Sequence, residues 1–189
     1  MLNGNIGKCV AKISAVKEQF RYIKAKTLVF DDQEEVKKAY EKGKLNRNVI
    51  IVVRNQGPKA NGMPELHSLT PMLSNVQDLG FKVALLTDGR MSGASGKILA
   101  AIHVTPEAID NGVIGKIEDD DEIEIDANNG KLNILTDISK RKNSLLNDMK
   151  KNQSFGRNIF NTLRIHSQGS EEGGGCLLYT SPSPRDREK

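Results

Sequence analysis

The sequence predicts a single mixed α/β domain. Two short aliphatic runs, at residues 49–53 and 83–86, have the composition of buried parallel strands. A glycine-rich polar loop follows each run, at 57–65 and 88–97, and a helical pattern separates the two. After these loops the apolar spacing changes to that of short strands joined by tight turns. This order of elements fits a mixed α/β domain better than a regular array of βαβ units.

The N-terminal part is expected to supply strands and one helix. Residues 3–16 are punctuated by glycine and prone to strand formation, and residues 20–30 alternate in part like a strand. Asp31 is the expected N-cap of the next helix, because its carboxylate can accept from the free amides of the first turn. Gly43 is the expected end of that helix.

The central part continues with alternating helix and strand. A helix is expected at 69–79, with a proline tolerated in its first turn, and a strand at 81–87. Residues 98–104 are apolar and read as a further strand. A short helical turn should follow, with Thr105 as its cap and Pro106 at its first helical position.

The third part should contain three short strands and then helices. Asn-Gly at the end of 128–130 favours a tight hairpin turn, because both residues accept positive φ. Asp119 to Asp121 is interpreted as a solvated turn, since it lacks the alternating ligands of a calcium loop. Asp137 is expected to cap a helical region up to residue 150, and 155–163 to form a second short helix. The three strands are marked by the pairs Ile114/Ile117, Ile123/Ile125 and Leu132/Ile134.

Two segments are assigned from composition. Residues 1–166 are expected to form the domain, and 167–189, rich in Gly, Ser and Pro, a disordered tail. From about residue 176 the tail resembles translated sequencing-adapter sequence, so it is interpreted as artefactual and no function is assigned to it.

Composition excludes several classes of function. The net charge of +4 is mild, lysines and arginines are scattered, and 4% of residues are aromatic, which argues against a nucleic-acid surface. No apolar run approaches the ~18 residues of a membrane span, and the N-terminus has no signal-peptide core. Two cysteines do not make a disulfide framework, so a cytoplasmic location is expected.

The two loops carry the reactive side chains. In the second loop, Arg90 and Lys97 could hold a carboxylate or phosphate, and Ser92 and Ser95 could donate hydrogen bonds or act as base or nucleophile. The alternative is a flexible surface turn with solvated charges. In the first loop, Glu65 could ligate a hard cation or simply complement a helix N-terminus.

The two histidines near these loops have a structural interpretation. His67 and His103 are interpreted as structural residues, because no His, Cys or carboxylate spacing resembles a zinc site.

Three motifs together carry a family resemblance. The stretches GPKANGMPELH, VALLTDGRMSGASGK and AAIHVTPEA resemble the C-terminal part of the dihydroxy-acid/phosphogluconate dehydratase family, and most of all its phosphogluconate-type members. The resemblance covers roughly residues 3–165. It implies a swivelling β/β/α domain, with a barrel-like mixed sheet flanked by helices.

The resemblance also implies a hydro-lyase reaction. A proton leaves C2 of a sugar acid, the C3 hydroxyl leaves as water, and a 2-keto-3-deoxy acid results. Ser92 matches the family's proposed base, and Glu65 matches a ligand of a Mg²⁺-type ion that grips the substrate carboxylate. Lys59, Arg90, Ser95 and Lys97 are candidates for phosphate binding from charge and loop position.

The family's iron–sulfur cluster, expected as 4Fe-4S, has its ligands in an N-terminal domain that this chain lacks. We therefore expect a C-terminal fragment that is inactive alone and belongs to a homodimer when full length. Three alternatives remain open: the same domain of a dihydroxy-acid or other sugar-acid dehydratase, a non-catalytic anion-binding module, or a small subunit that joins a separate cluster-bearing chain. The ANGMPELH and SGASGK loops speak against the first.

Overall fold

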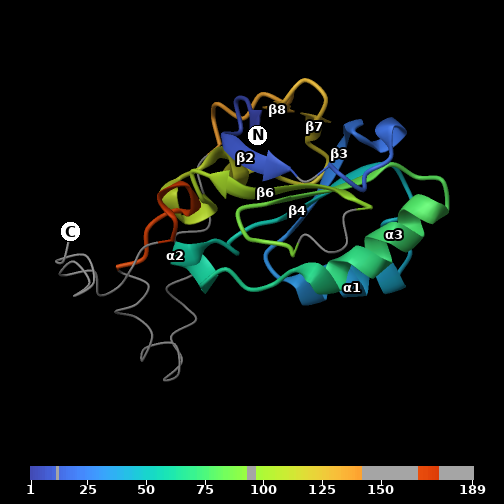
Figure 1. Ribbon diagram of the computed structural model, residues 1–189, viewed down its shortest axis with the longest axis horizontal. Coiled ribbons are helices and arrows are strands. Elements are labelled where there is room, and N and C mark those ends of the chain that lie inside the picture. Colours follow the sequence, from blue (N-terminus) through green and yellow to red (C-terminus); the bar gives the residue numbers. More distant parts are fainter. Residues whose placement is uncertain (12, 93–96, 142–165, 175–189) are drawn as a thin grey trace, which may run out of the picture.

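The computed structural model describes residues 1–11, 13–92, 97–141 and 166–174. Eight strands close into one barrel, in the order β1-β2-β6-β5-β4-β3-β7-β8 (Figure 1). The sheet is mixed: β3, β4, β5 and β6 are parallel neighbours, and the other pairs are antiparallel except β1 with β8. This confirms the expected barrel-like mixed sheet. The strands are β1 (Leu2–Asn3), β2 (Lys8–Ala11), β3 (Tyr22–Phe30), β4 (Val49–Val53), β5 (Val83–Thr87), β6 (Leu99–Thr105), β7 (Glu122–Asp126) and β8 (Lys131–Ile134).

Within the described residues, three α-helices accompany the barrel: α1 (Gln33–Glu41), α2 (Pro58–Asn61) and α3 (Thr70–Asp78). α1 and α3 lie side by side on one side of the barrel (Figure 1), joined by a hydrogen bond from Asn75 Nδ2 to Tyr40 Oη at 3.2 Å. α2 lies apart from them, in the first glycine-rich loop. Short 3-10 turns complete the described structure: η1 (Glu18–Phe20), η2 (His67–Leu69), η4 (Ala108–Asp110), η5 (Val113–Lys116) and η7 (Ser170–Glu172).

The protein has two hydrophobic cores, one on each face of the parallel strands. Because side chains alternate along a strand, Ile50 and Val52 point into the barrel, while Ile51 and Val53 point outward under α1 and α3. Both sets are fully buried. Burial on both faces explains why β4 and β5 are continuous aliphatic runs in the sequence.

Several local predictions need correction. The N-cap of α1 is Asp32, whose Oδ1 accepts from the Glu34 N–H at 2.9 Å, and Asp31 binds Arg54 Nε at 2.7 Å instead. The segment predicted as the first of three late strands is the 3-10 turn η5. The helical turn expected to begin at Pro106 begins at Ala108.

The acidic turn is also not fully solvated. Asp121 is 2% exposed, and its carboxylate binds the Arg141 guanidinium with N–O distances of 2.5 and 2.9 Å. The hairpin around the Asn-Gly turn is confirmed, since β7 and β8 pair antiparallel across it.

Some predictions fall outside the described residues. Most of the helical region expected up to residue 150, the helix at 155–163 and the tail from 175 lie there. Of the expected tail, residues 167–174 are described, and they contain η7. In the described part of the chain, no helix has the length and apolar character needed to cross a membrane.

Candidate functional site

The two glycine-rich loops meet at the ends of β4 and β5. The strands are parallel neighbours, so the loops that follow them emerge at the same end of the sheet. A single β-bridge joins Glu65 to Arg90, and the Leu66 N–H donates to the Arg90 carbonyl at 3.2 Å. The structure therefore brings together side chains that are far apart in the sequence.

The Glu65 carboxylate is the centre of this junction. Its Oε1 accepts from the backbone N–H groups of Ser92 at 2.7 Å and His67 at 3.0 Å. Its Oε2 accepts from the Arg90 guanidinium, at 3.2 Å from Nε and 2.9 Å from Nη2. The predicted base and the predicted metal ligand are thus direct neighbours, and Glu65 fixes the backbone of Ser92.

This environment keeps Glu65 ionised. Partial burial alone would raise its pKa, but the Ser92 N–H and the Arg90 guanidinium outweigh burial and lower the pKa below its ordinary value. The side chain is 37% exposed, so a ligand can reach it. The site therefore consists of a partly exposed carboxylate, that of Glu65, with the hydroxyl-bearing residue Ser92 beside it.

The buried Asp88 carboxylate ties together the chain segments at the start of the two loops. This fully buried carboxylate accepts three backbone N–H groups, from Asn55 at 3.1 Å, Gln56 at 2.9 Å and Ala108 at 3.1 Å. Burial raises its pKa, although these three bonds act in the opposite direction. Gly89 follows, and a Cβ there would lie 2.6 Å from the Gln56 Cβ, so only glycine lets the first loop pack so closely.

Glu107 is a second buried carboxyl group below the first loop. It is 1% exposed, and its Oε2 accepts from the Lys59 N–H at 3.3 Å. Within the described residues, its Oε1 has no hydrogen-bond partner. Burial and the neighbouring Asp88 charge raise the pKa of Glu107 to about 7. Gly57 packs directly against Glu107, because a Cβ at residue 57 would lie 2.1 Å from Glu107 Oε2.

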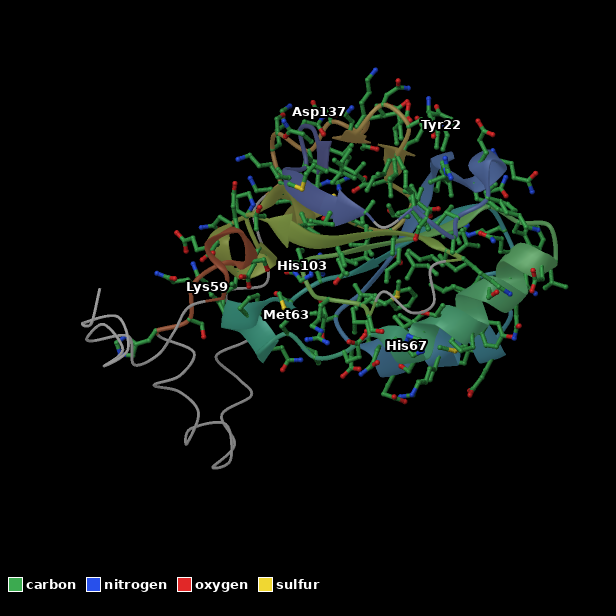
Figure 2. The ribbon with its side chains drawn as sticks, viewed as in Figure 1. Tyr22, Lys59, Met63, His67, His103 and Asp137 are labelled. Atoms are coloured by element: carbon green, nitrogen blue, oxygen red, sulfur yellow. The ribbon has the colours of Figure 1, made fainter. Side chains whose placement is uncertain are left out.

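Two of the four predicted phosphate-binding residues pair with different carboxylates. Arg90 pairs with Glu65, whereas Lys59 donates from Nζ to Asp110 at 2.7 Å. Figure 2 shows Lys59 well apart from His67, with Met63 lying between them. Lys97 is exposed, and Ser95 lies outside the described residues.

His103 is closer to the site than the sequence indicated. It lies in β6 with a φ of 57°, and its N–H donates to the Gly89 carbonyl at 2.9 Å. Burial and the Arg90 charge lower its pKa, so its imidazole is neutral at pH 7. Its place beside the second loop depends on the pairing of β5 with β6, which no local pattern reveals.

Three buried or half-buried groups were therefore missed as members of the site: Asp88, Glu107 and His103. Only Asp88 carries a usable sequence signal, because it is a carboxylate placed directly after a buried strand. Glu107 follows a proline and looks like an ordinary acidic residue of a first helical turn.

The described residues include no group of three or more His, Cys, Asp or Glu side chains able to hold a metal. Glu65 can contribute one oxygen ligand to a hard ion. Cys9 is buried inside the barrel, where desolvation raises the pKa of its thiol to about 12, so it is not a thiolate ligand at neutral pH.

Comparison with known proteins gives consistent matches. The family profile described as "Dihydroxy-acid/6-phosphogluconate dehydratase C-terminal" matches residues 1–174. The phosphogluconate dehydratase of Rhizobium meliloti is 50% identical over 182 residues, 95% of this chain and 30% of that protein. The phosphogluconate dehydratase of Escherichia coli K12 is 44% identical over 182 residues, again 95% of this chain and 30% of that protein.

A dihydroxy-acid dehydratase is also similar. That of Campylobacter lari is 42% identical over 148 residues, 75% of this chain and 26% of that protein. The chain thus spans about 30% of the length of the phosphogluconate dehydratases that it matches.

Proposed function

The chain belongs to the dihydroxy-acid/6-phosphogluconate dehydratase family, as its C-terminal domain, and on this basis we propose that it is part of a phosphogluconate dehydratase. The enzyme would eliminate water from 6-phospho-D-gluconate to give 2-dehydro-3-deoxy-6-phosphogluconate. Higher identity and longer coverage favour this substrate over a dihydroxy acid: 50% over 182 residues against 42% over 148. The remaining domain, which this chain does not include, would complete the active site.

Ser92 is the proposed base. Its side-chain oxygen, as the alkoxide, would take the proton from C2 of the substrate. The C3–O bond would then break, and the leaving hydroxide would take up that proton from the Ser92 hydroxyl group and depart as water. The enol that remains becomes the 2-keto acid by moving one proton from its C2 hydroxyl oxygen to C3. A serine hydroxyl is a weak base, so its task depends on an electrophilic environment that favours the alkoxide.

Glu65 is the proposed link between this base and a divalent ion. The observation that carries the proposal is the 2.7 Å hydrogen bond from the Ser92 N–H to Glu65 Oε1, since one carboxylate both fixes the base and offers an oxygen ligand. A Mg²⁺-type ion bound in part by Glu65 would grip the substrate carboxylate and make the C2 proton more acidic. Arg90, with a half-exposed side chain, can turn toward solvent and free Oε2 for this role.

The described residues do not fit an iron–sulfur cluster. Cys9, the described free cysteine, is a buried neutral thiol, and thiolates are the ligands that such clusters need. The proposed cluster therefore depends on cysteines of the remaining domain, and none of the steps assigned to this chain uses it. By resemblance, the complete enzyme would be a cytoplasmic homodimer.

A chimaera tests the proposal. Residues 1–174 would replace the matching C-terminal part of the Escherichia coli relative, and turnover of 6-phosphogluconate would be compared with that of a dihydroxy acid. We expect turnover of the phosphorylated sugar acid, lowered by roughly 10³-fold in Ser92→Ala with KM little changed. Ser74→Ala, a half-buried serine on α3, is the matched control and should keep full activity.

Four results would contradict the proposal. Full activity of the Ser92→Ala chimaera would remove Ser92 as the base. Preference for the dihydroxy acid would make the alternative substrate class correct. Dehydration by the 189-residue chain alone would show that it is not an inactive fragment, and tight binding without turnover in any chimaera would favour an anion-binding module.

A further inference from the structure

A cavity of about 250 Å³ has His103 in its lining. It is formed by Met1 and by residues of β2, β6 and η7. Its size suits one end of a small molecule, with mostly apolar walls and a few polar groups, as in many ligand pockets. The lining residues used below are Lys8 of β2, His103 and Thr105 of β6, and Ser170 and Glu171 of η7.

A carboxylate of the chain itself already occupies the anion-binding groups of this cavity. Glu171 Oε1 accepts from Lys8 Nζ at 2.7 Å, and its Oε2 accepts from Thr105 Oγ1 at 3.5 Å. The two side chains of the ion pair are 55% and 59% exposed, so solvent screens their attraction. A dianion could therefore replace Glu171 at Lys8 and Thr105.

Two further groups that line the cavity can donate hydrogen bonds to a ligand. The Ser170 hydroxyl oxygen is buried and has no hydrogen-bond partner among the described residues. His103 also lines the cavity, and a neutral imidazole has one ring N–H to donate. A buried hydroxyl group without a partner costs free energy, and an oxygen-rich ligand would relieve that cost.

His103 also connects the cavity to the second loop. Its backbone N–H donates to the Gly89 carbonyl, next to Arg90 and two residues from Met91. An elongated ligand could thus place one end in the cavity and the other near Glu65 and Ser92.

We propose that this cavity binds the phosphoryl group of the phosphorylated sugar acid, with Lys8, Thr105 and Ser170 as donors and Glu171 as the displaced internal competitor. The proposal rests on the function proposed above and adds phosphate donors on β2, β6 and η7 to the candidates in the loops. Of the four earlier candidates, Lys59 pairs with Asp110, Arg90 pairs with Glu65, Lys97 is exposed, and Ser95 lies outside the described residues. A phosphoryl group offers three acceptor oxygens, enough for these donors.

The first test measures binding to the 189-residue chain by calorimetry. The probes are orthophosphate, 6-phosphogluconate and gluconate. We expect the first two to bind, and gluconate to bind at least about tenfold more weakly than 6-phosphogluconate, because gluconate lacks the phosphoryl group and its charged acceptor oxygens. Equal affinity for gluconate and 6-phosphogluconate would overturn the proposal.

Paired variants make the test specific. Lys8→Gln should lower orthophosphate affinity about tenfold, while Glu171→Gln should raise it several-fold by removing the competitor. The control is Lys24→Gln, because Lys24 forms a comparably exposed ion pair with Glu122 on another part of the barrel. If Glu171→Gln weakens binding, or if Lys8→Gln has no more effect than Lys24→Gln, the cavity is not the phosphate site.

The same variants separate this proposal from the proposed function. In the chimaera, Lys8→Gln should raise KM for 6-phosphogluconate about tenfold with little change in kcat. Normal turnover with an unchanged KM would overturn the phosphate site and leave the function standing. Orthophosphate binding that depends on Lys8, without any dehydration by the chimaera, would overturn the function and leave the anion site standing.

Discussion

Glu107→Gln tests whether a buried carboxyl group under the first loop controls the pH dependence of stability. In the folded protein the pKa of Glu107 is about 7, against an ordinary value of 4.5. Between these pH values the folded state holds a proton that the unfolded state has released. The free energy of unfolding therefore falls as pH rises from about 4.5 to about 7.

The magnitude follows from the size of that difference. At about 1.36 kcal/mol for each pKa unit, the ionised side chain costs the folded protein roughly 3 kcal/mol above pH 7. Glutamine has the same shape, keeps an oxygen for the Lys59 N–H and carries no charge beside Asp88. Glu107→Gln should therefore match the wild type within about 1 kcal/mol at pH 5 and exceed it by roughly 2–3 kcal/mol at pH 8.

Urea unfolding at pH 5 and pH 8 measures this directly. Comparing the variant with the wild type at each pH cancels the contribution of other titrating groups. Glu41→Gln, at an exposed end of α1, is the control and should change stability equally at both pH values. If the Glu107→Gln and wild-type stabilities differ by the same amount at pH 5 and pH 8, the reasoning is wrong.

Three further changes have expected results that urea unfolding of the same chain can measure. Asp88→Ala should lower stability by about 3 kcal/mol, because it leaves three buried N–H groups without an acceptor. Gly57→Ala should cost about 2 kcal/mol or more, since the new Cβ would lie 2.1 Å from Glu107 Oε2. Arg141→Leu should cost about 3 kcal/mol by leaving the buried Asp121 carboxylate unpaired.

Each of these changes has a matched control. Asp78→Ala removes an exposed carboxylate, Lys140→Leu an exposed cation, and Gly169→Ala adds a Cβ that meets its nearest atom at 3.9 Å. All three controls should stay within about 0.5 kcal/mol of the wild type. A test variant that is no less stable than its control would contradict the structural role assigned to its residue.

The strands that the sequence predicted best are those buried on both faces or joined by a diagnostic turn. β4 and β5 are continuous aliphatic runs because two cores enclose them. Ile114 and Ile117 were predicted to mark a strand but belong to a segment with the 3-10 turn η5. Their spacing of three residues equals one 3-10 turn, so both can be buried on the same side.

The sequence predicted the site residues that belong to recognisable motifs. It did not predict those whose environment arises only from tertiary packing. Glu65 and Ser92 stand in recognisable loops, and the structure brings them together. Glu107 and His103 acquire their environments from strand pairing and burial across the barrel. On β2, Lys8 alternates with a buried cysteine, and this pattern alone predicts a solvent-facing strand residue. Only the structure shows that η7 packs beside it.

The closed ring of strands also decides how this domain can associate with other protein. The ring is completed by the pairing of Asn3 with Lys131, so each of the eight strands has a hydrogen-bonded neighbour on both sides. An open sheet edge would offer backbone groups for another chain to extend, which is also a common route to aggregation. Here a partner domain would have to bind through side chains and loops, and variants at those surfaces should weaken assembly without disturbing the barrel.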